Sequence, residues 1–135
     1  MRGLEPEFRN VDLEIVSVSN LQSLAEEMES RVSVLYCGPF EGRRKLLAIE
    51  AGVMVKNPDT AIHALCKVVE SLSRDSRRVW DRAKKVFDIG CEMHPSSDAP
   101  RIELRADTLA RVAALKASIG FTSYPADELR SDRRK

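Results

Sequence analysis

The sequence predicts an α+β fold in which a mixed β-sheet is covered by helices in two layers. Three observations predict it: segments that alternate apolar and polar residues, segments with apolar residues at three- and four-residue steps, and turn residues between them. With 135 residues, 43% of them hydrophobic, the chain is expected to form a single domain, 1–135, with flexible ends at 1–10 and 126–135.

The first half of the chain predicts three strands and two helices. Residues 11–18 are rich in β-branched side chains and predict a strand. Residues 31–37 and 45–51 predict two more strands, joined by a turn rich in glycine and proline. Between the first two strands, one helix carries its apolar face on Leu21, Leu24, Ala25 and Met28. Asn57-Pro58 begins the other, because a capping residue precedes a proline at the first helical position.

The stretch VWDRAKKVFDIGCEMH, residues 79–94, predicts a junction between a helix and a strand. Ser73 can cap the short helix that precedes it, with Trp80 on the inward face. Beyond Lys84 the period changes to two, which places apolar residues on one side of a strand. The opposite side holds Asp88, Gly90, Glu92 and His94.

The last third predicts a surface loop at 95–100, a strand at 101–105 and a helix that begins at Ala106. Gly120 is expected to end this helix before a strand at 121–124. The apolar face of the helix is expected on Leu109, Val112, Ala113 and Leu115. Shifting the chain by 88 positions aligns its first strand-helix-strand segment with this one, which is compatible with an internal duplication or with two unrelated amphipathic units.

The common catalytic motifs are missing from the sequence. It contains no GxxxxGK[ST], GxGxxG or GxSxG, which disfavours nucleotide and α/β-hydrolase chemistry. His63 and Cys66 are three residues apart on one helix, but Cys66 falls in the apolar stripe and is expected to be a packing residue. Asp88 and His94 are too far apart along a strand to share an ion, so we expect no metal and no cofactor.

Three cysteines without a CxxC pair are typical of a reduced, cytoplasmic protein. No apolar run could serve as a signal peptide or span a membrane, so no membrane association is expected.

The net charge of +1 makes any electrostatic binding surface local. Acidic residues dominate the first 30 positions, whereas basic residues dominate 74–85. Nucleic acid is disfavoured as a partner, because the basic segment has only one aromatic residue, Trp80, and its position is expected to face inward, where it could not stack on bases. The candidate binding residues are Glu26, Glu27 and Glu29, the basic helix residues Arg74, Arg77, Arg78 and Arg82, and the strand residues Asp88 and Glu92.

The pattern from the Ile62 helix through Trp80 and Phe87-Asp88-Ile89-Gly90 to the strand at 122–124 resembles a family of small bacterial α+β proteins of unknown function. In size and in the lack of catalytic motifs, such proteins are similar to cytosolic immunity proteins that neutralise toxins. The resemblance implies inhibition by binding and assigns no individual residue.

The sequence therefore predicts a non-enzymatic protein-binding module, most concretely an immunity protein that binds a toxin. One alternative is a ligand-binding or enzymatic domain that uses Asp88, Glu92 and His94. A second is a nucleic-acid-associated protein that uses the basic helix at 74–85. A free sheet edge would also allow a homodimer.

Overall fold

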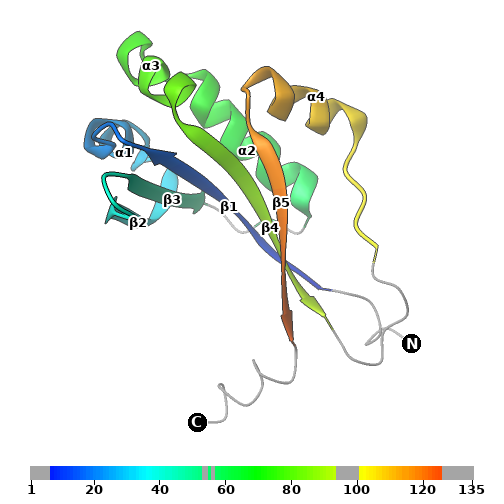
Figure 1. The fold of residues 1–135 in the computed structure, drawn as a ribbon. Coiled ribbons are helices and arrows are strands. Elements are labelled where there is room, and N and C mark those ends of the chain that lie inside the picture. The colour runs from blue at the N-terminus through cyan, green and yellow to red at the C-terminus, as the bar shows by residue number, and fades with distance from the viewer. Residues whose placement is uncertain (1–6, 53–54, 56, 94–100, 126–135) are drawn as a thin grey trace.

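The computed structural model describes residues 7–52, 55, 57–93 and 101–125. Five strands and four helices follow one another along this part of the chain (Figure 1). The strands are β1 (Glu7–Ser17), β2 (Val32–Pro39), β3 (Lys45–Ala51), β4 (Lys84–Met93) and β5 (Ser118–Pro125). The helices are α1 (Gln22–Met28), α2 (Pro58–Glu70), α3 (Arg74–Arg82) and α4 (Ala106–Ala114).

The five strands form one mixed sheet in the order β2-β3-β1-β4-β5. β4 and β5 are parallel, and the other neighbouring pairs are antiparallel. The apolar residues that alternate along β1, β3 and β4 are buried beneath the helices, and the residues between them form an opposite face. The predicted two-layer α+β fold is confirmed.

The start of helix α2 follows from its local sequence. The Asn57 side chain accepts a hydrogen bond of 2.8 Å from the Thr60 N–H, and Pro58 occupies the first turn, where no N–H is needed. Helix α3 begins in the same way, because the Ser73 hydroxyl accepts from the Ser76 N–H. Both predicted helix starts are confirmed.

The segment around Trp80 is a structural junction, as predicted. Trp80 is fully buried, and its indole N–H donates a hydrogen bond of 3.0 Å to the Leu115 carbonyl at the end of α4. The chain leaves α3 at Ala83 and enters β4 directly, where Phe87 and Ile89 are completely buried. Tryptophan therefore joins two helices within the core and is not an exposed functional residue.

Three predictions for the last third are wrong. Residues 101–105 form no strand, although Ile102 and Leu104 do pack against the core. In α4, Leu109 is 47% exposed, and Thr108 is buried in its place. Ala113 is also exposed, whereas Val112 and Leu115 are buried as predicted, and the Thr108 hydroxyl bonds to Asp59 and His63 of α2. Gly120 does not end the helix, because it lies inside β5.

The helix instead ends where Lys116 takes a left-handed conformation, with φ of 59°. Gly120 is paired with Asp88 of β4, and a Cβ at this glycine would lie 3.2 Å from the Val86 Cγ1 atom and 3.4 Å from the Asp88 Oδ1 atom. The glycine thus packs closely against two side chains of β4, a contact that the one-dimensional pattern could not reveal.

The two ends of the chain each form a strand-helix-strand unit, but not at the predicted offset. β1 and β2 both pair antiparallel with β3 and so run parallel to each other, and α1 connects them. At the other end, α4 connects the parallel strands β4 and β5. The first strand of the second unit is β4 and not residues 101–105, so the gapless alignment at 88 positions fails there.

Candidate functional site: the acidic open face of the sheet

A cluster of acidic residues lies on the sheet face opposite the helices. Asp12 of β1 is paired with Glu50 of β3 on one side and with Asp88 of β4 on the other. Glu14 lies two residues farther along β1 and therefore on the same face. We call Asp12, Glu14, Glu50 and Asp88 the acidic face. Neighbouring strands lie about 4.8 Å apart, so three carboxylates meet in a row across three strands.

The polar contacts within the acidic face are hydrogen bonds from neutral side chains. The Asn10 amide donates to Asp12 at 3.0 Å and to Glu50 at 2.9 Å. The Thr122 hydroxyl of β5 lies 2.9 Å from both carboxylate oxygens of Asp88. Among the residues that the structure describes, no ion pair reaches any of the four carboxylates. Among the described residues, these carboxylates are therefore held by hydrogen bonds from neutral side chains and not by ion pairs.

This crowding changes the proton affinity of the acids. Burial, and then the charges of Glu50, Asp88 and Glu14, raise the pKa of Asp12 to about 6. Burial and the charge of Asp88 also raise the pKa of Glu14. Like charges placed directly opposite on neighbouring strands destabilise a sheet. The acidic face is consequently an arrangement that costs folding stability.

A small residue in β4 makes this arrangement possible. Gly90 is the partner of Asn10, and a Cβ at this glycine would lie only 2.9 Å from the Asn10 Oδ1 atom. The sequence predicts that Gly90 leaves an opening for a ligand or another backbone. In the structure, the Asn10 and Tyr124 side chains lie over it. The glycine therefore supports the hydrogen-bonding amide that binds two of the acids.

A hollow of about 260 Å³ adjoins the acidic face. Arg9, Asn10, Ser33 and Glu50 contribute to its polar lining, and Val55 to its apolar lining. The Arg9 guanidinium lies 5.0 Å from the centre of the Tyr124 ring. β1 extends beyond its pairing with β3, which ends at Asp12 and Glu50, and the hollow lies beside this extension.

Of the acidic residues predicted on α1, Glu27 has a structural contact. Its carboxylate accepts hydrogen bonds from the Ser73 N–H at 2.6 Å, the Ser73 hydroxyl at 2.8 Å and the Ser76 hydroxyl at 2.6 Å. These bonds lower the pKa of Glu27 and hold α1 against the start of α3. Glu26 accepts from the Gln22 amide on its own helix, and Glu29 is exposed at the end of α1.

The basic residues of α3 are partly engaged with acids of the same helix. Arg77 lies 3.5 Å from Asp81, and Arg78 lies 3.9 Å from Asp75. Arg74 and Arg82 are exposed. Lys85, which follows the helix, is buried with its ammonium 5.3 Å from the centre of the Trp80 ring.

The predicted strand site is only partly assembled. Asp88 belongs to the acidic face, whereas Glu92 is only 6% exposed, beside Glu7 and Tyr124 in the strand register. His94 lies outside the described residues. In the part of the chain that the structure describes, no group of three or more histidine, cysteine or acidic residues could hold a metal ion.

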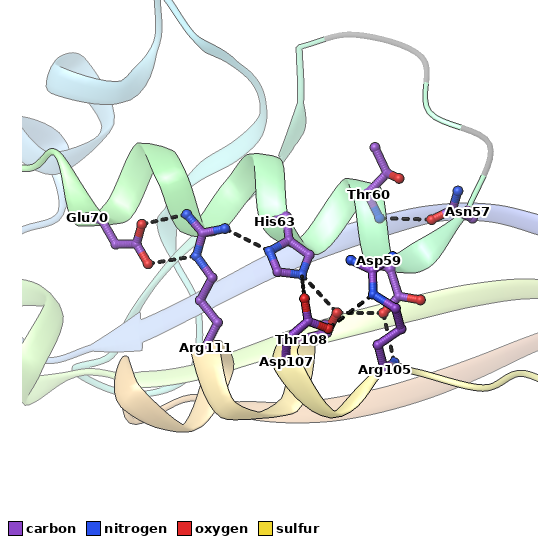
Figure 2. A network of polar contacts seen from close by, with 9 residues as sticks. All are labelled: Asn57, Asp59, Thr60, His63, Glu70, Arg105, Asp107, Thr108 and Arg111. Carbon is purple, nitrogen blue, oxygen red and sulfur yellow. Dashed lines mark hydrogen bonds and ion pairs between the residues drawn. The ribbon is translucent and has the colours of Figure 1, made fainter.

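A second polar cluster lies between α2 and α4 (Figure 2). Thr108 donates to Asp59 at 2.6 Å, and its oxygen lies 2.9 Å from His63 Nε2. His63 Nδ1 lies 2.7 Å from Arg111, which also forms two hydrogen bonds with Glu70. The cluster joins the two helices through a buried threonine, so we assign it a structural role.

The contacts of His63 in this cluster also show that it does not act as a base for the Cys66 thiol. Both nitrogens of His63 contact residues of α4, and Cys66 is fully buried. Burial raises the pKa of the Cys66 thiol to about 11, which disfavours the reactive thiolate. The predicted packing role of Cys66 is confirmed.

Comparisons with protein-family models, with curated proteins and with solved structures found no match. Within the described ranges, none of the helices has the length and apolar character needed to cross a membrane. The interpretation of this protein thus depends on its own residues.

The sequence analysis missed most of the acidic face. Asp12 and Glu14 were visible as polar positions between Val11, Leu13 and Ile15, and Glu50 follows the apolar Ile49. That alternation was the available signal, and it places each acid on the solvent side of its own strand. Only the sheet order brings the three strands together.

Proposed function

We propose that this protein acts by binding a basic protein through the acidic face, without catalysing a reaction. The observation that carries the proposal is the row of Glu50, Asp12 and Asp88 in register on three adjacent strands, with no ion pair among the described residues. A partner that places lysine or arginine side chains over this row would supply the missing counter-charge. Complementary charge of this kind speeds association and selects partners.

The surroundings of the acids suit a protein partner. Half-buried aliphatic residues, Val16, Leu46 and Val86, share the open face with them. The long stem of lysine or arginine can pack on such residues while its charged end reaches a carboxylate. The hollow beside Glu50 and Arg9 extends this surface at one end. The combination favours a folded surface with basic and apolar side chains over a small ion.

In its most concrete form, the proposed partner is a bacterial toxin whose basic active site the acidic face would cover. The resemblance to small bacterial proteins motivates this choice of partner, and the charge of the face specifies its chemistry. An inhibitor of this kind needs no catalytic group of its own. It needs a rigid surface, and a sheet supported by a buried core is one.

Binding to a basic partner should depend on pH in a defined direction. A nearby positive charge favours the ionised carboxylate and would lower the raised pKa of Asp12 in the complex. Complex formation would then release protons near pH 6. The affinity should therefore increase as the pH rises from about 5 to 7.

The test is capture of partners from lysates of the source organism and of bacteria that compete with it. The bait variant carries Asp12→Asn, Glu50→Gln and Asp88→Asn, which keep shape and remove charge. The matched control carries Glu26→Gln and Glu29→Gln on α1, outside the acidic face. Partners are identified by mass spectrometry and measured again as purified proteins.

The proposal expects a basic protein that binds the parent and the α1 control but not the acidic-face variant. With the purified partner, affinity should fall at least tenfold in the variant and decrease with salt. A partner that binds the acidic-face variant as tightly as the parent would overturn the proposal. So would a partner whose affinity is unchanged between pH 5 and 7.

A further inference from the structure

The two edge strands have an unusual composition. Charged residues make up 32% of the chain, yet β2, with the sequence VSVLYCGP, and β5, with SIGFTSYP, contain none. The three central strands all contain charged residues. Soluble proteins usually place charges, above all lysine, on edge strands to prevent pairing with another chain. Neither edge strand has this protection by charge, although β2 ends at Pro39 and its pairing with β3 shifts register between Val34 and Tyr36.

The β2 edge also exposes apolar side chains. Val34, Leu35, Tyr36 and Phe40 are 40%, 49%, 45% and 48% exposed. β2 pairs with β3 on one side only, and no described strand lies on its outer side (Figure 1). Its free backbone groups and these four side chains therefore share one exposed margin of the molecule.

We propose that a second copy of this chain pairs with the outer edge of β2 through its own β2. Antiparallel pairing of two identical strands is compatible with a twofold axis, which is the commonest symmetry of homodimers. An axis that passes near the middle of β2 places Leu35 close to Leu35 of the second copy and pairs each end of the strand with the opposite end of the other copy. Because β2 carries no charged residue, no like charges meet when two copies of it pair, and electrostatic repulsion within the strand pair does not oppose the dimer. The product is a continuous sheet built from two five-stranded sheets.

The acidic faces do not oppose this pairing. With a strand spacing of about 4.8 Å, the two copies of β3, which carries Glu50, would lie about 14 Å apart in the continuous sheet, and the two copies of β1 about 24 Å apart. Both distances exceed the Debye length of about 8 Å at physiological salt, so repulsion between the two acidic faces is screened. Antiparallel pairing of this kind places both acidic faces on the same side of the continuous sheet, and the sheet twist rotates one relative to the other.

The other edge strand is less suitable for self-pairing. The Arg9 guanidinium lies over Tyr124 near the C-terminal end of β5, so a strand added to this edge would lie beside a positive charge. In addition, the Thr122 hydroxyl of β5 is bonded to Asp88. We therefore assign the self-pairing edge to β2 and use β5 as the comparison edge.

A pairing limited mainly to one strand of eight residues should be weak. Its buried area would fall below the roughly 1,200 Å² that marks small interfaces, so dissociation in the micromolar range is expected. Sedimentation equilibrium of the full chain at concentrations from about 1 to 200 µM covers this range. The parent should change from monomer to dimer as concentration rises.

Two single substitutions test which edge is used. Leu35→Lys adds a charge to the exposed centre of β2, and Ser123→Lys adds the same charge to an exposed position of β5. The first should raise the dimer dissociation constant about tenfold or more, because it removes apolar contact from both copies and introduces like charges. The second should leave it unchanged. Circular dichroism and melting temperature confirm that both variants fold.

Mixing variants tests the symmetry of the pairing. Leu35→Lys and Leu35→Glu should each be monomeric alone, because like charges then meet across the axis. An equal mixture should form a heterodimer, because each lysine then lies near a glutamate. A parent that stays monomeric at every concentration overturns the proposal, as does a dimer that survives Leu35→Lys. A dimer that is lost only in Ser123→Lys would assign the interface to β5 and overturn the choice of β2.

Discussion

Replacing Asp12 by asparagine should stabilise this protein at neutral pH. Asparagine has nearly the same shape, and its Oδ1 atom can still accept the hydrogen bond that Asn10 donates to Asp12. What the substitution removes is a half-buried negative charge that faces Glu50 and Asp88. The folded protein would thus keep its contacts and lose a repulsion.

The magnitude follows from the raised pKa of Asp12. A rise from 3.8 to about 6 corresponds to about 3 kcal/mol of unfavourable free energy for the ionised form, at 1.36 kcal/mol per pH unit. Because Asp12 is partly exposed, solvent screening reduces the expected gain to about 1–2 kcal/mol. This is a large effect for a substitution on the surface of a sheet.

The raised pKa of Asp12 also determines how the stability difference between the variant and the parent changes with pH. The folded-state pKa lies above the unfolded value, so the stability that Asp12 contributes is present in acid and is lost as the pH rises through about 6. The Asp12→Asn variant should therefore exceed the parent in free energy of unfolding at pH 7.5. The difference should shrink steadily as the pH falls to 4.

Urea denaturation at pH 7.5, 6, 5 and 4 measures this difference. Glu26→Gln serves as the control, since it neutralises an exposed carboxylate on α1 that is not part of the acidic face. A variant that is less stable than the parent at pH 7.5 would refute the reasoning, and so would a gain that is the same at every pH. Either result would mean that the acidic face is not under electrostatic strain.

Three further predictions concern the core and the helix contacts. Trp80→Ala should lower the free energy of unfolding by about 3–5 kcal/mol in urea titrations, since the ring is fully buried; a loss below 1 kcal/mol would contradict its core position. Glu27→Gln should cost about 1 kcal/mol, because the neutral amide weakens three hydrogen bonds to α3, whereas Glu26→Gln should change stability by less than about 0.5 kcal/mol. Equal effects of these two substitutions would show that the charge of Glu27 does not strengthen the α1–α3 contact. The Cys66 thiol should resist alkylation in the native protein at pH 8 and react in urea, as mass spectrometry would show; rapid native labelling would contradict its burial and raised pKa.

If the acidic face binds a partner, stability and function conflict there. Neutralising Asp12 should raise stability while weakening the proposed complex, which is the behaviour expected of a functional surface. A purely structural position would show no such opposition. Measuring both quantities on the same variant therefore separates a binding role from a packing role.

The sequence alone determined most of the element positions in the first two thirds of the chain. A strand at 45–51 was predicted with the bounds that the structure shows, and both helices with side-chain caps begin where Asn57 and Ser73 predict. These features depend on interactions between residues close in sequence: a cap bonds a neighbouring N–H, and alternation is a local property of a strand. Trp80 was correctly placed in the core for the same reason.

The tertiary structure decided the features that depend on residues far apart. The orientation of α4 follows from the contact of Thr108 with Asp59 and His63 of α2, which overrides the apolar stripe that Leu109 and Ala113 suggest. The local sequence predicts that Gly120 ends a helix, whereas the structure pairs it with Asp88 inside the sheet. Residues 101–105 alternate like a strand, but β5 occupies the position beside β4.

The acidic face shows the same division. Each strand's alternation determines which of its residues point away from the core, so Asp12, Glu50 and Asp88 could each be assigned to an outer face from sequence. That the three form one row depends on β1 lying between β3 and β4 in a particular register. Register is set by the packing of all the buried side chains together, because a shift of one residue would reverse every side chain of a strand. Local pattern thus fixed the direction of each charge, and only the assembled core fixed its neighbours.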